Sequence, residues 1–390
     1  MPTSVHEKPL RVLHIGKYFP PHAGGMETYL QDLIVVQHRQ GQQVTALVHA
    51  SSATAFDRDQ QVDALDGTSF KVRLAARWFN LGFVPVSPFF WLAAFKLIRQ
   101  FKPNIIHIHH PNLSAAWLLL LPIARKVPWV AHWQSDIVTP SSSRFVRFCY
   151  AFYRPFEQQL LNRSALIFAT SSNYVEASEA LNKHLSKVEV IPLGLDTRRL
   201  PDPDQLQQMD RLKGSPLVLF LGRLARYKGL PNLLNAIARL PNVHCWLVGD
   251  GSERRILVNE VARLKIQDRV CFVGSVNEEQ KWRHLKTADV VVLPSTDKNE
   301  AFGMVILEAG HLGKSMVVTD IEGSGTAWVA RQFGATVVAA SDLGALTAGI
   351  RQVLSMPPRD SKDVQSTDGG PFNLATQSGE IIDHYRSVGS

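Results

Sequence analysis

The sequence has few cysteines and shows no segment of the kind that carries a chain into or across a membrane. Its three cysteines lie far apart without Cys-x-x-Cys spacing: Cys149, Cys245 and Cys271. This argues against a disulfide framework or a zinc site and fits a reducing compartment. The N-terminus lacks the apolar core of a signal peptide. No apolar run of about 18 residues occurs, so we expect no transmembrane helix and a cytoplasmic location.

Acidic residues are scarce in the first half of the chain. Residues 1–190 hold 19 Lys and Arg against 12 Asp and Glu, a net charge of +7, whereas residues 191–390 hold 23 against 22. A basic surface of this kind attracts a polyanion, either nucleic acid or an anionic membrane face. A solvated surface without a partner is the alternative interpretation.

The length and composition favour two globular α/β domains. At about 150 residues per domain the chain holds two, and a hydrophobic content of 45% allows each to bury a core. Strand-like apolar runs alternate with helix-length segments, a pattern typical of parallel sheets covered by helices. In the first half, strands are expected at 11–16, 43–49, 104–109, 129–132, 165–170 and 188–191, and helices at 27–39 and 114–126.

The same pattern restarts after residue 192. Strands are expected at 216–221, 244–248, 270–273, 290–293 and 316–319, and helices at 230–239, 252–264 and 373–388. The sequence therefore predicts two doubly wound, Rossmann-like domains, residues 1–192 and 193–358, followed by a loop and terminal helix in residues 359–390. Ligands of open α/β sheets bind beyond the carboxyl ends of the strands, so the residues that follow strands are the first candidates for a site.

Two glycines and two cations follow predicted strands. Gly24 and Gly25 precede the first helix, where backbone N–H groups can bind an anion, although a tight turn explains them equally well. Arg223 directly follows the strand at 216–221, and Lys228 begins the next helix. Two cations at a strand end can neutralise a diphosphate. The alternative is a pair of surface cations on a loop.

Further motifs follow later strands. Gly249 follows a predicted strand and permits close approach of a nucleotide. The alternative interpretation is that this glycine only forms a turn. Glu300 and Glu308 are separated by seven residues; the first is expected in the loop after the strand at 290–293 and the second in the next helix. The start of that helix offers N–H groups for phosphate, and the carboxylates can bind sugar and ribose hydroxyls. Both could instead be surface glutamates, but Glu308 lies among apolar neighbours and needs a partner.

The order and spacing of these motifs resemble glycosyltransferase family 4, retaining enzymes of the GT-B fold, over nearly the whole chain. The resemblance rests on Gly24-Gly25-Met26-Glu27, Ile191-Pro192-Leu193-Gly194-Leu195-Asp196, Gly222-Arg223 with Lys228-Gly229, Val248-Gly249-Asp250-Gly251, and the Glu300/Glu308 pair. It implies a nucleotide-sugar donor in the second domain, an acceptor in the first, and a terminal segment that crosses back. Within the family, the chain is similar to bacterial polysaccharide mannosyltransferases. This similarity implies transfer of mannose from GDP-mannose to a glycan or lipid-linked glycan. UDP-glucose or UDP-N-acetylhexosamine is the next choice of donor.

The resemblance also implies a role for each motif. Arg223 and Lys228 would hold the donor diphosphate. Glu308 would bind the ribose, and Glu300 the hydroxyls of the donor sugar. The remaining donor-binding residues act through their backbone beside the nucleotide or its distal phosphate: Gly24, Gly25, Gly249, Phe302, Gly303, Met304 and Val305. Family members of this type use no metal, so we expect neither a metal nor another cofactor.

One segment departs from the family pattern. The family often has a His shortly before an Asp, and here the segment reads Ala131-His132-Trp133-Gln134-Ser135-Asp136. Aligned on Asp136, the usual His position is Gln134, which can bond a sugar hydroxyl but cannot carry charge. Either His132 substitutes or the His is dispensable. His132, Asp136 and Glu300 are the candidate catalytic residues.

The histidines His107, His109 and His110 invite a metal interpretation. Alternation along a strand puts His107 and His109 on one face. Neither Cys nor a carboxylate accompanies them, so we expect no metal there. The resemblance places His-x-His on the acceptor side.

Residues 142–161 interleave basic and aromatic side chains: Arg144, Arg147 and Arg154 with Phe145, Phe148, Tyr150, Phe152, Tyr153 and Phe156. Such a helix suits an anionic bilayer surface, or it packs in the core with its arginines at the edge. With the basic first half, we favour peripheral membrane association and a polyprenyl-diphosphate-linked acceptor.

Two other functions remain as alternatives. An NDP-sugar epimerase of the same architecture would need an acid/base pair in the cleft, and the Glu pair fits it poorly. A nucleic-acid-binding protein would suit the basic charge, but the sequence lacks a stacking-aromatic module or zinc signature. No glycosidase-type carboxylate pair stands out, so double displacement is not favoured.

Overall fold

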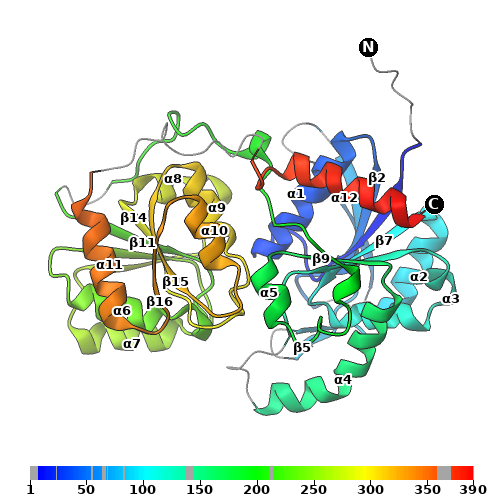
Figure 1. Cartoon of the computed structure of the whole chain (residues 1–390), viewed down its shortest axis with the longest axis horizontal. Coiled ribbons are helices and arrows are strands. Elements are labelled where there is room, and N and C mark those ends of the chain that lie inside the picture. The colour runs from blue at the N-terminus through cyan, green and yellow to red at the C-terminus, as the bar shows by residue number, and fades with distance from the viewer. Residues whose placement is uncertain are drawn as a thin grey trace.

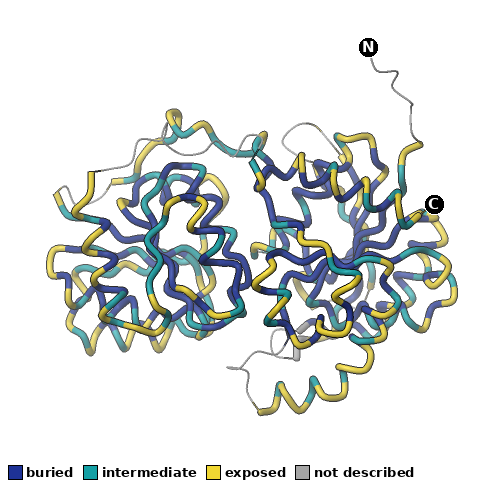
Figure 2. The backbone as a smooth tube through the Cα atoms, in the orientation of Figure 1, coloured by how far each residue is buried: buried dark blue, intermediate teal, exposed yellow. Residues whose placement is uncertain are grey.

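The structure, a computed structural model, describes residues 8–22, 24–53, 56–63, 67, 69–81, 84–137, 144–210, 214–357 and 370–389. The chain folds into two α/β lobes that lie side by side (Figure 1). Buried residues fill the interior of each lobe (Figure 2). The predicted architecture of two Rossmann-like domains is confirmed.

The N-terminal lobe is built on an eight-stranded sheet, counted over the described residues, with the order β10-β9-β8-β7-β1-β2-β4-β3. Only the pairing of β3 with β4 is antiparallel among the pairs described for this sheet. The strands are β1 (Arg11–Ile15), β2 (Gln43–His49), β3 (Arg58–Asp63), β4 (Ser69–Ala75), β7 (Ile105–His110), β8 (Trp129–Trp133), β9 (Leu166–Ala169) and β10 (Val188–Val190). The short hairpin of β5 (Phe79–Leu81) and β6 (Val84–Val86) lies outside this sheet.

The helices of this lobe are α1 (Gly25–Arg39), α2 (Phe90–Phe101), α3 (Pro122–Arg125), α4 (Arg144–Arg163) and α5 (Ser172–Ala177), with 3-10 segments η1 (Leu113–Leu120) and η2 (Leu185–Lys187). The predicted helix at 114–126 is therefore wrong. Leu121 takes an extended backbone between η1 and α3. The ring of Pro122 disfavours the helical conformation for the residue before it, which divides the apolar run in two.

The C-terminal lobe has a six-stranded sheet, again over the described residues, with the order β13-β12-β11-β14-β15-β16. Its described pairs are all parallel. The strands are β11 (Leu217–Leu221), β12 (His244–Val248), β13 (Val270–Gly274), β14 (Val290–Leu293), β15 (Ser315–Asp320) and β16 (Thr336–Ala339). The helices are α6 (Leu230–Ala238), α7 (Arg254–Leu264), α8 (Glu278–Thr287), α9 (Met304–His311), α10 (Thr326–Gln332) and α11 (Leu343–Ser355), with 3-10 turns η3 (Thr197–Arg199) and η4 (Arg226–Lys228).

The last helix, α12 (Leu374–Gly389), lies against α1 in the N-terminal lobe (Figure 1). Leu195, in the segment between the lobes, forms a parallel bridge with Asn373 just before α12. Tyr385 of α12 is fully buried and its hydroxyl accepts a hydrogen bond from Nε2 of Gln37 on α1, at 3.2 Å. The described part of the predicted terminal segment thus packs on the first lobe, while residues 359–369 lie outside the described residues.

Candidate active site

A buried ion pair lies at the carboxyl end of the second sheet. The ammonium of Lys228, at the end of η4, contacts the carboxylate of Glu300 in the loop after β14. Oγ of Ser295 donates to the same Glu300 oxygen at 3.0 Å. Burial alone disfavours the Lys228 ammonium, but the adjacent Glu300 carboxylate outweighs it and raises the pKa of Lys228. Two predicted donor-binding residues therefore form one charged unit.

Helix α9 begins directly after this unit. Gly303 precedes it with φ 80°, a left-handed conformation that favours glycine. A Cβ atom at Gly303 would also lie 2.9 Å from Cδ1 of Ile306. The first N–H groups of a helix have no partner within it and carry partial positive charge, so the segment from Phe302 to Val305 can receive a phosphate oxygen.

Glu308 lies one turn into α9 and is buried, as its apolar neighbours suggest. Its carboxylate accepts a hydrogen bond from Nζ of Lys281 on α8, at 2.7 Å. Burial disfavours the Lys281 ammonium, but Glu308 and Glu278 raise its pKa. The partner that a buried Glu308 requires is thus Lys281, which sequence reasoning did not identify.

The loops after β11 and β12 touch each other closely. Gly249 has φ 127°, and a Cβ atom there would lie 2.0 Å from the carbonyl oxygen of Gly222. Only glycine fits at Gly249, because any side chain would collide with this backbone. Arg223 follows Gly222 with an exposed side chain. It is close enough to the N-terminal lobe to influence Lys17 and Glu27 electrostatically.

The start of α1 faces the start of α9 across the junction of the lobes. A Cβ atom at Gly25 would lie 3.2 Å from Cγ of Met304. A Cβ atom at Gly24 would lie 2.1 Å from Oε2 of Glu27, whose side chain folds back over the helix start. The structure thus brings Gly24, Gly25 and Met304 together, and two helix N-termini converge where an anion could bind.

His132 and Gln134 have different surroundings in the structure. His132 is fully buried on β8, with its ring 5.4 Å from those of Tyr29 and His107, and neither ring nitrogen has a hydrogen-bond partner among the described residues. Gln134, just beyond β8, lines a small pocket together with Lys17 and Glu27. The residue at the usual His position is therefore the one at the pocket, and a catalytic role for His132 stays a prediction.

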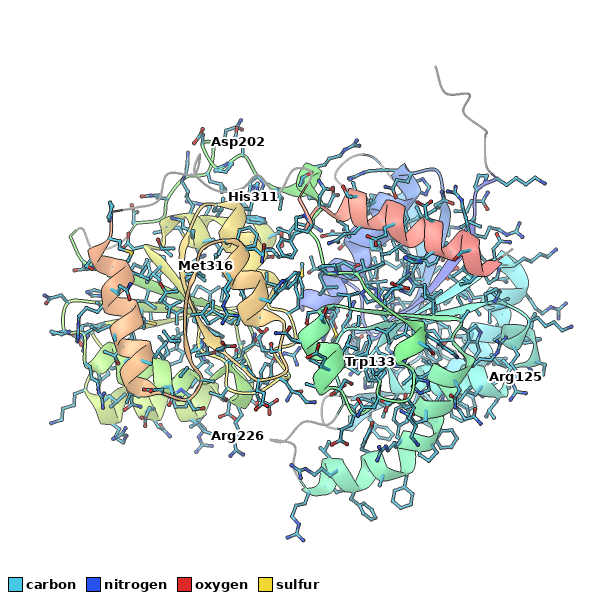
Figure 3. The ribbon with its side chains drawn as sticks, in the orientation of Figure 1. Arg125, Trp133, Asp202, Arg226, His311 and Met316 are labelled. Atoms are coloured by element: carbon cyan, nitrogen blue, oxygen red, sulfur yellow. The ribbon has the colours of Figure 1, made fainter. Side chains whose placement is uncertain are left out.

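Asp136 lies in a network that joins the lobes. Its Oδ1 accepts hydrogen bonds from Nε1 of Trp133 at 2.9 Å and from Oγ of Ser178 at 2.6 Å. Its Oδ2 lies 2.9 Å from Nζ of Lys298 in the C-terminal lobe. Trp133 itself is fully buried within the first lobe (Figure 3). Through these contacts Asp136 helps to hold the lobes together. Its predicted catalytic role stays a prediction.

The strand histidines form a cluster larger than expected. His14 of β1 lies opposite His107 of β7, and His109 lies opposite His132, so all four share one face of the sheet. His14, His107 and His109 each offer a ring nitrogen within 4.8 Å of the others, close enough for a metal ion. However, Nδ1 of His14 lies 3.0 Å from Nε2 of His109, and Nε2 of His14 lies 2.9 Å from Oε1 of Gln37. Both nitrogens of His14 are thus used in hydrogen bonds, and absence of a metal stays a prediction.

Lys17 and Glu27 are absent from the predicted site residues although they line the pocket. Burial lowers the pKa of Lys17 to about 8; the Glu27 carboxylate opposes this shift and the Arg223 guanidinium adds to it. The strand-end rule that identifies Arg223 applies equally to Lys17, two residues after β1. Glu27 had no comparable signal, because an acidic residue in a first helical turn is common for helix stability alone.

The assembled site has two facing walls. The wall of the C-terminal lobe is rich in cations and helix N–H groups, and the wall of the N-terminal lobe holds the small pocket with the carboxylate of Glu27. The first wall can bind a diphosphate and stabilise it as a leaving group. Glu300 and Glu308 can accept hydrogen bonds from sugar hydroxyls. This arrangement can position a nucleotide-activated sugar at the junction of two lobes.

Comparison with known families agrees with this geometry. Residues 24–194 match the model of the glycosyl transferase 4-like domain, and residues 202–366 match that of the glycosyl transferases group 1. The O-antigen chain mannosyltransferase C of Escherichia coli is 30% identical over 328 residues, 82% of each chain. The phosphatidyl-myo-inositol mannosyltransferase of Mycobacterium tuberculosis is 28% identical over 311 residues, 77% of this chain and 75% of the relative.

Solved structures show the same fold. Sucrose-phosphate synthase from Thermosynechococcus elongatus superposes with a TM-score of 0.76 at 20% identity, covering 97% of this chain and 98% of its own. Anabaena HepE in complex with UDP-glucose superposes with a TM-score of 0.70 at 19% identity, covering 97% of this chain and 100% of its own. Neither of these proteins, nor either relative above, is named as an epimerase or a nucleic-acid-binding protein. The chain is a glycosyltransferase of family 4, with the GT-B fold.

Proposed function

We propose that this glycosyltransferase transfers mannose from GDP-mannose to a glycan or lipid-linked glycan during surface polysaccharide synthesis, with retention of anomeric configuration and without a metal. The observation that carries the proposal is the Lys228–Glu300 pair beside the α9 N-terminus, facing the N-terminus of α1. The choice of mannose is supported by the E. coli relative, which is named as a mannosyltransferase.

In this proposal each group of residues has a separate task. Arg223, Lys228 and the N–H groups before α9 stabilise the charge that develops on the departing diphosphate. Glu308 binds the ribose, and Glu300 orients the donor sugar. The leaving phosphate oxygen takes the proton of the incoming hydroxyl on the same face of the sugar. Contact between the lobes excludes water and so protects the donor from hydrolysis.

A thermal-shift screen without added metal tests the donor. Its probes are GDP-mannose, GDP, UDP-glucose, UDP-N-acetylglucosamine, UDP and ADP. A ligand that binds only the folded chain raises the melting temperature according to its affinity. We expect the largest shift with GDP-mannose and its loss in Arg223→Ala. A shift with the uridine nucleotides alone would favour a UDP-sugar donor, and no shift with any probe would contradict the assigned donor site.

Helix α4 supports a peripheral membrane location and a lipid-linked acceptor. It carries a row of exposed phenylalanines three and four residues apart: Phe145, Phe148, Phe152 and Phe156. They lie exposed rather than in the core, contrary to the alternative of a core-packing helix. Arg144 and Arg154 are also exposed on α4, which projects from the lobe (Figure 1). Aromatic and basic groups together suit an anionic bilayer surface.

No helix of the described residues is both long and apolar enough to span a bilayer. Residues 142 and 143 of the predicted amphipathic stretch lie outside the described residues. A polyprenyl diphosphate would place its sugar close to the bilayer, where α4 would hold the N-terminal lobe. The M. tuberculosis relative is named for a lipid acceptor, phosphatidyl-myo-inositol, which supports this part of the proposal.

A further inference from the structure

A chain of ion pairs leads from Glu308 toward the N-terminal lobe. Nζ of Lys281 on α8 lies 2.7 Å from Oε1 of Glu308 and 2.7 Å from Oε1 of Glu278. The same Glu278 oxygen lies 3.1 Å from a guanidinium nitrogen of Arg199, in η3 between the lobes. The other terminal nitrogen of Arg199 contacts the carboxylate of Asp32 on α1. Alternating charges thus connect helix α9 with helix α1.

The two ends of this chain are shielded from water, and its middle is half exposed. The side chains of Asp32 and Glu308 are 4% and 10% exposed, whereas that of Glu278 is 48% exposed. Burial raises the pKa of Asp32 to about 7, although the Arg199 guanidinium opposes the shift. A buried carboxylate without a cation takes up a proton, so each end of the chain depends on its cation to stay charged.

Lys281 restricts the position of the Glu308 carboxylate. Its ammonium is held by two carboxylates and also lies 4.7 Å from the centre of the Trp282 ring, an arrangement that attracts a cation. Nε1 of Trp282 in turn donates to Oε1 of Glu278 at 3.1 Å. Lys281 contacts Oε1 of Glu308, so Oε2 can still accept a hydrogen bond from a hydroxyl group. A side chain that binds a ligand in one defined geometry needs supporting contacts of this kind.

Glu278 holds two cations at one oxygen atom. Two cations as close to each other as Lys281 and Arg199 repel unless a carboxylate lies between them. Burial disfavours the charged form of Glu278, but Lys281 and Arg199 outweigh burial and lower its pKa. Loss of the Glu278 charge would therefore push the two cations apart and weaken the hold of Lys281 on Glu308.

A second contact joins the same helix to the segment between the lobes. Nε2 of His311, at the end of α9 (Figure 3), donates to the carbonyl oxygen of Pro201 at 3.3 Å. Its ring lies 6.1 Å from that of Trp282. Glu308 is three residues before His311 and so lies on the same side of α9. The side of α9 that carries Glu308 is thus connected to the inter-lobe segment at two points.

We propose that Lys281, Glu278 and Arg199 are positioning residues for recognition of the donor ribose. They hold Glu308 in place and tie it to Asp32 of α1, so that ribose binding in one lobe depends on a contact made by the other. Networks of ion pairs can carry such coupling between distant groups, because each charge is held by the next. The inference rests on the proposed function, in which Glu308 binds the ribose.

Isothermal titration with GDP and with GDP that lacks both ribose hydroxyls (dideoxy-GDP) tests the proposal. If the donor screen selects uridine, UDP and dideoxy-UDP take their place. We expect Lys281→Met to lose about tenfold or more in affinity for GDP and to bind dideoxy-GDP like the wild type, because only the contact with the hydroxyls is lost. Lys281→Arg keeps the charge and should recover part of the loss. Arg351→Met, exposed on α11, is the matched control.

Variants farther along the chain test the connection between the lobes. Glu278→Gln, Arg199→Met and Asp32→Asn should each weaken GDP binding severalfold and leave dideoxy-GDP binding unchanged. Adding Arg199→Met to Lys281→Met should weaken it little further, because residues of one network are not additive. Circular dichroism shows which variants are folded. If Lys281→Met does not fold, Glu278→Gln at the half-exposed middle of the chain provides the test.

Several outcomes would contradict the proposal. Equal losses for both nucleotides in folded variants would indicate a purely structural role, and wild-type affinity for GDP would indicate no role; either result overturns the inference and leaves the transferase proposal intact. A loss in Lys281→Met without a loss in Asp32→Asn would overturn the connection with the N-terminal lobe. A wild-type chain that binds GDP and dideoxy-GDP equally would contradict ribose binding by Glu308. A wild-type chain that binds no nucleotide would contradict both proposals.

Discussion

Nζ of Lys298, in the loop after β14, lies 2.9 Å from Oδ2 of Asp136 in the opposite lobe. The same ammonium donates to the carbonyl oxygen of Ala177, also at 2.9 Å. A second contact connects the lobes, since the guanidinium of Arg199 in the inter-lobe segment contacts Asp32 of α1 and lies 3.1 Å from the carboxylate of Glu278 on α8. Charged groups thus connect the lobes at these points, beside apolar contacts such as that of Ala301 with the cluster of Trp133 and Tyr174 in the first lobe.

Replacing Lys298 should loosen this contact. Lys298→Met leaves the Asp136 carboxylate, which is 8% exposed, without its cation. Loss of one partner of a buried pair costs up to about 3–5 kcal/mol, and less for a partly exposed pair such as this. We expect a larger radius of gyration in small-angle X-ray scattering and a several-fold higher KM for the donor. Unchanged scattering and KM would show that the pair does not hold the lobes.

The Lys228–Glu300 pair should be needed for donor binding and turnover. Lys228→Met removes the cation and leaves Glu300 buried and unpaired, so we expect at least about a hundredfold loss in kcat/KM, about 2.7 kcal/mol. Glu300→Gln keeps the shape, and we expect it to retain nucleotide binding while losing turnover. Lys183→Met, on the exposed surface, is the control. Steady-state kinetics and titration with GDP separate the two effects.

The close approach of Gly25 to Met304 predicts a steric effect. Gly25→Ala places a methyl group 3.2 Å from Cγ of Met304, so one lobe must shift by a few tenths of an ångström. We expect lower turnover with little loss of stability, and partial recovery when Met304→Ala is added. The methyl group of Gly379→Ala on α12 meets no atom of the other described residues within 4 Å, so this variant should stabilise the helix by roughly 0.5–1 kcal/mol. Equal activity of Gly25→Ala and wild type would argue against close contact at this point.

The buried histidines of β1, β7 and β8 predict an early loss of stability in acid. Burial lowers the pKa of His14 to about 4 and the pKa of His110 to about 3. Burial, together with the nearby His14, also lowers the pKa of His132 to about 3. These imidazoles stay neutral in the folded chain, whereas the unfolded chain binds protons below pH 6.5. Their stabilisation is therefore complete above pH 6.5 and falls below it, by about 1.4 kcal/mol per pH unit for each histidine.

Thermal unfolding between pH 7.5 and 4.5 measures this effect. We expect a steep fall in melting temperature below pH 6.5 and a shallower fall in His132→Leu, which removes one titrating group. Because both ring nitrogens of His132 lack hydrogen-bond partners in the part of the chain that the structure describes, this variant should also be folded at neutral pH. Its activity tests the predicted catalytic role, since loss of turnover in the folded variant would support it and wild-type turnover would exclude it.

The row of phenylalanines on α4 predicts binding to anionic vesicles. The rings of Phe148 and Phe152 are 5.1 Å apart and both are exposed. Phe148→Ser with Phe152→Ser should reduce flotation with phosphatidylglycerol-containing liposomes at least severalfold, because burial of aromatic area drives insertion. High salt should weaken binding through the arginines. Absence of salt-sensitive flotation in the wild type would contradict the membrane proposal.

Much of the fold was accessible from local patterns. Strand-like runs such as 43–49 became β2 with the same bounds, because a strand buried on both faces reads as a continuous apolar segment. The strand β3 was missed because Arg58–Asp63 is polar and exposed at the sheet edge, and its pairing with β4 supplies the structure. At 114–126, a single proline decided between one helix and two short segments.

By itself, the sequence predicted the two α/β domains, the family, and Arg223, Lys228, Glu300 and Glu308 as candidate site residues, because these predictions depend on periodicity and on the order and spacing of motifs. Only the tertiary structure decided which of them meet. The Lys228–Glu300 pair spans 72 residues of chain and the Asp136–Lys298 pair spans 162. It also placed Gln134 rather than His132 at the pocket, and brought Lys17 and Glu27 to the same place. Contacts between side chains so distant in the sequence depend on how sheets and helices pack, and no local pattern encodes that packing.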